Sequence, residues 1–121
     1  MPNIFAALAI AIGSWLGVPG GSWTPATTDI APVKAQLQNY VRQEAKSKGA
    51  TLPAWGRYTF QYYGQSLHGR RIIFVNAFCS KPPPNAHRQL VVVLDGGACY
   101  FQAYWDSATQ SFAGVQFNGH A

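Results

Sequence analysis

Apolar residues recur at helical spacing over residues 29–48, in the first half of the chain. Thr28 or Asp29 can accept hydrogen bonds from the first helical amides, and Pro32 lies in the first turn, where a missing N–H costs little. Gly49 suits the left-handed conformation at which helices commonly end. The spacing therefore predicts one amphipathic helix. The residues of its apolar face are Val33, Leu37, Tyr40, Val41 and Ala45.

The second half of the chain has the pattern of β-strands. Residues 57–62 alternate between apolar and polar, which predicts a strand with one buried face. Residues 71–79 are apolar on both faces, as expected of a central strand, and residues 64–69 are predicted to form the turn before it. Three prolines at 82–84 prevent regular pairing and predict a stiff loop. The aromatic positions that alternate in the first strand are Tyr58, Phe60 and Tyr62.

Residues 90–94 are apolar throughout and are predicted to form another buried strand. Gly96 and Gly97 then allow either a tight hairpin or a bulge in one long bent strand. The strand that follows alternates, and residues 112–117 close the sheet after a turn at 106–110. One face of the alternating strand carries Cys99, Phe101, Ala103 and Trp105, and the other carries Tyr100, Gln102 and Tyr104.

These elements predict an α+β fold in which one helix packs on a curved antiparallel sheet of four or five strands, a cystatin-like arrangement. We assign residues 29–121 to this single domain. Residues 1–28 are assigned to an apolar segment followed by a linker rich in Gly, Pro and Ser.

Residues 4–18 form a charge-free apolar run that is shorter than the roughly 20 residues of a membrane span. The run fits the apolar region of a signal peptide, although no Lys or Arg precedes it. The alternative is an uncleaved helix that packs on the domain, on a membrane or on a second copy. We therefore expect a periplasmic or secreted protein, with membrane contact limited to residues 4–18.

Composition agrees with one packed core. The 121 residues are 48% hydrophobic, 14% aromatic and 11% charged, the opposite of the balance in disordered chains. The formal net charge is +5, and all nine basic residues lie between Lys34 and Arg88. The basic middle part of the chain favours an anionic partner. However, the basic residues are spread along the sequence, which is typical of solvated charges.

Cys79 and Cys99 are the only cysteines of the chain. In an exported protein two cysteines are most simply a disulfide, here closing a loop of about 20 residues. In a plain meander, however, Cys79 ends one strand while Cys99 lies near the opposite end of its neighbours, too far for a disulfide. Either the glycine bend and the proline loop bring the two together, or they are buried thiols.

No catalytic, cofactor or metal motif stands out, so we expect no cofactor and no metal, and enzymatic activity is not favoured. A cysteine hydrolase needs a thiolate beside an imidazole, but no spacing selects Cys79 or Cys99 with a particular histidine. The chain has no Cys-x-x-Cys or His-x-x-x-His pair for zinc. Asp95 and the two glycines after it do not precede a predicted helix that could hold a phosphate. The histidines are His68, His87 and His120.

Nucleic-acid binding would use basic residues to meet phosphates and aromatic residues to stack on bases. Tyr62, Tyr63, Arg70 and Arg71 surround one predicted turn and are the candidates for such a site. An RNA-recognition module normally has two helices and only one is predicted here, so a nucleic-acid partner is not favoured.

Four segments carry a resemblance to other proteins: residues 58–64 (Tyr-Thr-Phe-Gln-Tyr-Tyr-Gly), 74–79 (Phe-Val-Asn-Ala-Phe-Cys), 91–101 (Val-Val-Val-Leu-Asp-Gly-Gly-Ala-Cys-Tyr-Phe) and 115–121. With them, the chain from Trp55 onward resembles a family of small uncharacterised exported proteins of Gram-negative bacteria. The resemblance implies export, suggests that Cys79 and Cys99 belong together, and brings no activity.

A shorter likeness concerns protease inhibitors. Gln-Ser-Phe-Ala-Gly at 110–114 is similar to the Gln-x-Val-x-Gly hairpin with which cystatins plug cysteine-protease clefts, and Pro-Ala-Trp at 53–55 is similar to their Pro-Trp hairpin. The two motifs stand in the wrong order along the chain, Phe replaces Val, and Ala interrupts Pro-Trp.

We therefore expect a non-enzymatic exported domain that binds another protein through exposed aromatic residues on its sheet or loops. The alternatives are a small cysteine-dependent hydrolase and the binding of nucleic acid or another anionic ligand at the basic turn. No sequence feature indicates an oligomeric state. The candidate surface residues are Tyr62, Tyr63, Arg70, Arg71, Tyr100 and Tyr104.

Overall fold

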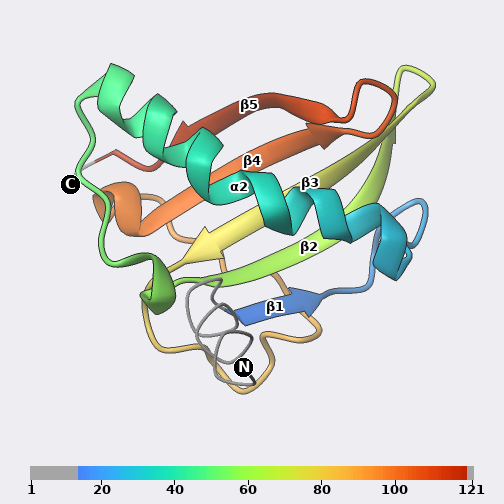
Figure 1. Ribbon diagram of the computed structural model, residues 1–121. Helices are drawn as coiled ribbons and strands as arrows, with labels where there is room; N and C mark the ends of the chain where they lie inside the picture. Colours follow the sequence, from blue (N-terminus) through green and yellow to red (C-terminus); the bar gives the residue numbers. More distant parts are fainter. Residues whose placement is uncertain (1–13, 120–121) are drawn as a thin grey trace, which may run out of the picture.

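The structure, a computed structural model, describes residues 14–119 and shows one helix lying across one face of a five-stranded sheet (Figure 1). The predicted α+β class is confirmed, and the sheet does not close on itself. In their order across the sheet, the strands are β1 (Ser14–Gly17), β2 (Thr59–Leu67), β3 (Arg70–Phe78), β4 (Tyr100–Asp106) and β5 (Ser111–Phe117).

β1 makes the sheet mixed, because it runs parallel to β2 while every other pair is antiparallel. The prediction of a purely antiparallel sheet is wrong in this respect. The helix between the two strands carries the chain back to the starting end of the sheet, so β2 runs in the same direction as β1. β1 comes from the segment expected to be a leader and linker, and residues 4–13 of the apolar run lie outside the described residues.

The chain after β1 also follows β2. The Ser22 N–H donates to the Gly64 carbonyl at 2.9 Å, and Trp23 forms an isolated β-bridge with Gly64. A Cβ atom on Gly21 would lie 2.2 Å from the Gly64 oxygen, so only glycine permits this approach. Gly21 therefore allows the close backbone packing of this segment on β2.

Helix α2 (Thr27–Lys48) begins slightly earlier than predicted. Its N-cap is Ala26, and the Asp29 carboxylate accepts a hydrogen bond from the Ala26 N–H at 2.7 Å, so neither Thr28 nor Asp29 is the cap. The helix ends at Gly49, whose φ of 69° is left-handed as predicted. Its buried residues are Ile30, Val33, Leu37, Val41 and Ala45.

The hairpin between β2 and β3 is tighter than predicted. Its turn consists of His68 and Gly69, whose φ values are 51° and 76°. Two consecutive residues with positive φ are typical of a type I′ turn, whose twist matches that of the flanking strands. The predicted turn at 64–69 is therefore wrong, because residues 64–67 belong to the strand and pair with residues 70–73.

The core lies between α2 and the sheet face that the helix covers. The alternation predicted for β4 is confirmed there, since Phe101, Ala103 and Trp105 are all fully buried. Each large apolar side chain buried in this way contributes roughly 1.5–3 kcal/mol to stability. The residues that the sheet contributes to the core are Phe60, Ile73, Val75, Ala77, Phe101, Ala103, Trp105 and Val115.

Residues 90–94 do not form the predicted buried strand. β3 and β4 are direct neighbours, so the sheet has no free strand position between them. Val92 and Leu94 are instead 77% and 90% exposed. The apolar run was misleading because it belongs to a loop, residues 79–96, that connects β3 to β4.

Gly96 and Gly97 form neither the hairpin nor the bulge considered from the sequence, because both needed a strand before them. Their φ values of 90° and 63° are left-handed, and they lead into a short 3-10 helix (Gly97–Cys99) that enters β4. Glycine is favoured at both because other residues rarely adopt this conformation.

The side-chain amide of Gln61 ties the 79–96 loop to the sheet. Gln61 alternates with core residues of β2, so it points to the side opposite α2, which we call the back face. Its Nε2 donates to the carbonyls of Ala86 and Gln89, both at 2.7 Å. Its Oε1 accepts from Asn76 Nδ2 and from the Val91 N–H, both at 2.9 Å. The buried amide therefore uses both donors and both acceptor sites.

Replacing Gln61 with Leu is expected to lower the free energy of unfolding by about 2–4 kcal/mol, because it leaves several buried polar groups without partners. Urea unfolding measures the loss. The matched control is Gln65→Leu in the same strand, since Gln65 is half-buried and its side chain makes no hydrogen bond within residues 14–119. Equal losses in the two variants would contradict the role given to Gln61.

Candidate binding surface

Three aromatic side chains form a row across the back face, which we call the aromatic row. Tyr63, Phe74 and Tyr104 occupy register-paired positions of β2, β3 and β4. The ring centroids of Tyr63 and Phe74 are 5.1 Å apart, and those of Phe74 and Tyr104 are 5.4 Å apart. All three residues are half-buried, so the row keeps a solvent-accessible side.

A row of amide side chains runs beside the aromatic row. Its members are paired in register from β2 to β5: Gln61, Asn76, Gln102 and Gln116. Gln102 donates from Nε2 to Asn76 Oδ1 at 3.3 Å, which connects the buried pair to the accessible half of the row. Gln102 is half-buried and Gln116 is exposed, so their amides can both donate and accept hydrogen bonds with a ligand.

The 79–96 loop and the back face enclose a cleft of about 370 Å³. Its floor includes Phe74 and the amides of Gln102 and Gln116, and its wall includes Val92 and Leu94. No residue that lines it carries a formal charge. The cleft therefore combines an apolar wall, an aromatic ring and uncharged hydrogen-bonding groups.

The structure brings together only some of the residues proposed from the sequence. Tyr63 and Tyr104 lie on the back face, with Phe74 between them. Tyr62 points to the opposite side of the sheet, because successive strand residues face opposite ways. On that side the centroid of its ring lies 6.3 Å from that of Trp15. Tyr100 is half-buried, and its ring lies beside the Gly96 backbone.

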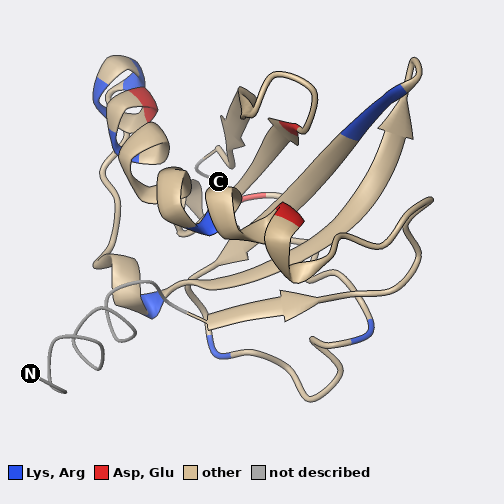
Figure 2. Cartoon of the chain, turned by 45° about the vertical axis from the view of Figure 1, so that its right-hand side comes forward, with Lys and Arg blue, Asp and Glu red and all other residues tan. Residues whose placement is uncertain are grey.

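The two arginines of the predicted basic turn already have partners. Arg70 donates to the Asp106 carboxylate at 2.8 Å, and the Arg71 guanidinium lies 5.1 Å from the centre of the Trp23 ring. Figure 2 shows Lys and Arg distributed over α2, the start of β3 and the loops, not gathered in one patch. Asp106 therefore compensates the charge of Arg70, while the neutral Trp23 ring orients Arg71 without cancelling its charge.

Sequence reasoning missed Phe74, Val92, Leu94 and Gln116 as surface residues. The strand that contains Phe74 is apolar on both faces, so alternation alone does not show which face stays accessible. Val92 and Leu94 were missed because their run was assigned to a strand. Gln102 was already placed on the same face as Tyr104 by the alternation of its strand, a signal that could have indicated the amide row.

The structure places the cysteines and histidines that were considered for catalysis or metal binding as follows. Both cysteines are in a disulfide, so neither is a thiol nucleophile in this state. No group of three or more His, Cys, Asp or Glu side chains in residues 14–119 could hold a metal ion. His68 is in the type I′ turn, His87 is exposed, and His120 lies outside the described residues. No helix of residues 14–119 has the length and apolar composition of a membrane span.

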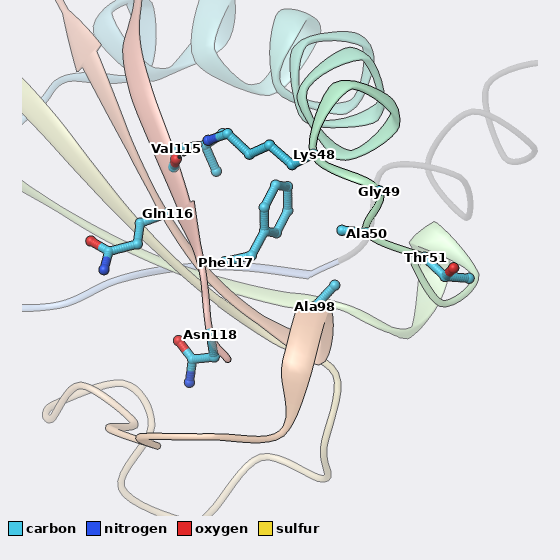
Figure 3. Close-up of a pocket in the computed structure, with 9 residues that line it drawn as sticks. All are labelled: Lys48, Gly49, Ala50, Thr51, Ala98, Val115, Gln116, Phe117 and Asn118. Carbon is cyan, nitrogen blue, oxygen red and sulfur yellow. Dashed lines mark hydrogen bonds between the residues drawn. The ribbon is translucent and has the colours of Figure 1, made fainter. Parts of the chain in front are cut away.

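A second cleft, of about 580 Å³, lies beside β5 at the end of α2, and we call it the edge cleft (Figure 3). Residues of the helix end and of the chain after it form one side, and the last residues of β5 form the other. The residues that define it are Lys48, Ala50, Thr51, Ala98, Val115 and Phe117.

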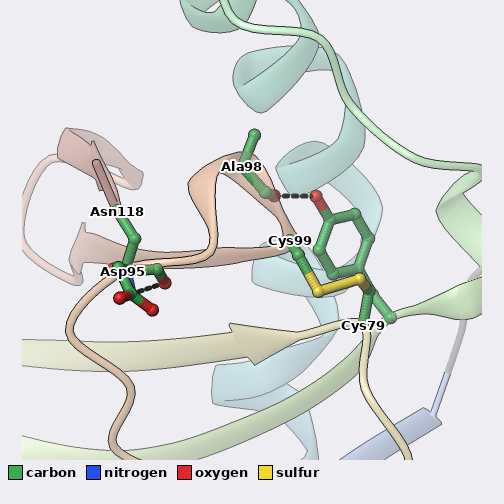
Figure 4. Close-up of a disulfide and its surroundings, with 6 residues drawn as sticks. Cys79, Asp95, Ala98, Cys99 and Asn118 are labelled. Atoms are coloured by element: carbon green, nitrogen blue, oxygen red, sulfur yellow. Dashed lines mark hydrogen bonds between the residues drawn. A yellow bond between two sulfur atoms is a disulfide. The ribbon is translucent and has the colours of Figure 1, made fainter. Parts of the chain in front are cut away.

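Cys79 and Cys99 form a disulfide at the root of the 79–96 loop, with their Cα atoms 5.0 Å apart (Figure 4). The geometric objection raised from the sequence disappears because residues 90–94 are not a strand. Phe78, at the end of β3, is paired in register with Tyr100, at the start of β4, so the cysteines just beyond them are adjacent. The Cys79 N–H also donates to the Cys99 carbonyl at 2.9 Å.

Tyr58 supports the same region from inside the core. Its hydroxyl donates to the carbonyl of Ala98, next to the disulfide, and the side chain is only 1% exposed. Burial raises the pKa of the phenol well above its ordinary value of 10.0, and the nearby Arg57 opposes this shift only in part. The phenol therefore stays protonated in the folded protein at pH values where it ionises in the unfolded chain.

No protein-family model, no curated protein and no solved structure matches this chain.

The raised pKa of Tyr58 predicts a loss of stability in alkaline solution. The contribution of the protonated phenol is complete below about pH 10 and is lost as the pH rises through the higher folded-state pKa. Urea unfolding from pH 7 to 11 should show the decline, and Tyr58→Phe should flatten it while costing about 1 kcal/mol at pH 7 for the lost hydrogen bond.

Tyr40→Phe serves as the comparison, because burial and Glu44 also raise the pKa of Tyr40, which is only half-buried. The Tyr40→Phe variant should keep the larger part of the loss of stability between pH 7 and pH 11. A decline that is unchanged in Tyr58→Phe would contradict the assignment.

Proposed function

We propose that this protein is a non-enzymatic domain that binds another protein through its back face. The surface consists of the aromatic row together with Val92 and Leu94, and we call it the back-face surface. The observation that carries the proposal is the position of these two exposed aliphatic side chains on the wall of a cleft whose floor includes a ring of the aromatic row.

The chemistry of this surface suits a protein partner. Contiguous accessible apolar groups bordered by polar ones are typical of interaction sites, and aromatic side chains are enriched where proteins meet. The amides of Gln102 and Gln116 can satisfy backbone groups of a partner that would otherwise lose hydrogen bonds to water. Because the cleft is uncharged, its binding should depend little on salt.

We also propose that the domain is exported to the periplasm or secreted. The Cys79–Cys99 disulfide supports this location, since disulfides persist in oxidising compartments and are rare in the cytosol. The resemblance to small exported proteins of Gram-negative bacteria is consistent with it. The apolar run at residues 4–18 supports it less, because residues 14–17 of that run form β1 of the folded sheet.

The other functions considered have less support. A cysteine hydrolase would need the disulfide to open before it had a nucleophile. Cystatin-like inhibition would need Trp55 at the surface, but this residue is 8% exposed and belongs to the core. An anionic ligand would have to displace Asp106 from Arg70.

Site-specific photo-cross-linking tests the proposed surface. A photoreactive residue at Leu94, in the cells that produce the protein, should give a discrete adduct with another protein, because Leu94 is 90% exposed at the cleft. The same residue at Ser47, which is exposed on α2, is the control and should give none. Adducts are measured by their mass and abundance.

Tyr104→Ala should reduce the Leu94 adduct at least about fivefold, as expected for an aromatic side chain that contributes to binding. Thr109→Ala, in the exposed turn after the same strand, should leave it unchanged. The proposal fails if Leu94 and Ser47 give the same products, or if Tyr104→Ala folds normally and keeps the full adduct.

A further inference from the structure

β5 has an accessible backbone edge. Among the described strands its only neighbour is β4. The Asn118 N–H donates to the Tyr100 carbonyl at 2.9 Å, which fixes the alternation of hydrogen-bonded pairs between the two strands. It follows that the N–H and C=O groups of Val115 and Phe117 point away from β4, toward the edge cleft.

The edge that is free for pairing is short. A bulge in the pairing near Tyr104 and Trp105 ends the regular ladder at one side, and β5 ends at Phe117 on the other. Bulges commonly restrict the pairing of edge strands. Val115 and Phe117 are therefore the two residues whose outward groups remain aligned, enough for about three residues of an added strand.

Lys48 occupies part of this edge. Its Nζ donates to the Val115 carbonyl at 3.0 Å, an acceptor that an added strand would use. The nearest carboxylate oxygen, that of Glu44, is 3.8 Å away, a separation too long for a hydrogen bond. Lys48 is the one charged residue among the described residues that line the edge cleft, and it is 47% exposed. The ammonium group also lies 5.8 Å from the centre of the Phe117 ring, so the Val115 carbonyl is its hydrogen-bond acceptor and Glu44 forms only a longer ion pair with it.

We propose that the edge of β5 binds an extended peptide segment by strand addition, with a carboxylate of that peptide held by Lys48. An N–H of the peptide replaces Lys48 at the Val115 carbonyl, and carbonyls of the peptide accept from Val115 and Phe117. The released ammonium then meets the carboxylate, a stronger partner than a carbonyl. The carboxylate comes from an acidic side chain or from the C-terminal end of the peptide.

The edge cleft is the observation that makes room for this strand. Its volume of about 580 Å³ lies between β5 and the chain that follows α2, as Figure 3 shows. Ala98, Val115 and Phe117 supply apolar contacts for the side chains of the peptide. The two clefts share Gln116, Phe117 and Asn118, but this site binds through the Val115 backbone and Lys48, which do not line the back-face cleft, so it does not rest on the function proposed there.

Three pentapeptides of alternating threonine and valine test the site on the full, isotope-labelled chain. One has a free C-terminal carboxyl, one is amidated, and one is amidated with an aspartate at its centre. Nuclear magnetic resonance follows the shift and the hydrogen exchange of the Val115 and Phe117 amides. We expect both amides to shift and to exchange more slowly with the two carboxylate peptides, which should bind about tenfold more tightly than the neutral one. The carboxylate peptide that binds more tightly identifies the source of the carboxylate, either the C-terminal end or an acidic side chain.

Two pairs of variants separate the parts of the proposal. Lys48→Gln should remove the tenfold preference for carboxylate, whereas Lys46→Gln, in the same last turn but outside the edge cleft, should keep it. Val115→Pro removes an N–H that points away from β4 and should abolish binding, at a cost in stability because Val115 belongs to the core, whereas Val115→Thr should keep the N–H and bind. Thermal unfolding verifies that each variant is folded.

Three results would overturn the proposal. The first is the absence of any response of Val115 and Phe117 to all three peptides at millimolar concentration. The second is equal affinity for the charged and neutral peptides in the unmodified chain. The third is slower exchange of both amides when protein concentration alone increases, which would assign the edge to a second copy of the chain.

Discussion

The four hydrogen bonds of the Gln61 amide determine where the connection between β3 and β4 lies. In the low-polarity interior each unpaired polar group is costly. If the loop left the sheet, the Gln61 amide and its partners would lose several hydrogen bonds at once. Because the Val91 backbone is fixed, the neighbouring Val92 and Leu94 project outward. Together with Asn118, whose Nδ2 donates to the Val93 and Asp95 carbonyls, and with the Cys79–Cys99 disulfide, this amide holds the loop that forms the apolar wall of the cleft.

The two faces of the sheet differ because alternate residues of the same strands meet different neighbours. Toward α2, strand residues such as Val75 and Phe101 pack into an apolar core. Toward the loop, the same strands present the aromatic row and the amide row, which a flexible backbone could not hold in register. The helix therefore stabilises one face, and the opposite face remains available for recognition.

Much of the fold follows from local sequence signals, and the rest depends on contacts between distant residues. The spacing of apolar residues correctly located α2, and alternation correctly placed Phe101 and Trp105 in the core. The mistaken strand at 90–94 arose because apolar composition does not distinguish a buried strand from a loop held by side-chain amides. Only the pairing of β3 with β4 shows that no strand position is free.

The candidate sites were harder to predict than the fold. Tyr63 and Tyr104 were named as candidates from the sequence, but the intervening Phe74 becomes evident only when the three strands are placed in register. The disulfide needed the same information, because Cys79 and Cys99 are brought together by the pairing of Phe78 with Tyr100. The sequence predicted that residues 112–117 close the sheet, but which of their N–H and C=O groups point outward becomes evident only from the register with β4.

The parallel pairing of β1 with β2 has a consequence for the order of folding. The antiparallel hairpins β2–β3 and β4–β5 are closed by short turns, whereas Ser14 meets Thr59 only after the whole of α2 has been placed between them. Closing that long loop costs chain entropy before the few contacts of β1 compensate for it. Among the described strands, β1 comes first along the chain, yet this cost predicts that it joins the sheet after the two hairpins have formed.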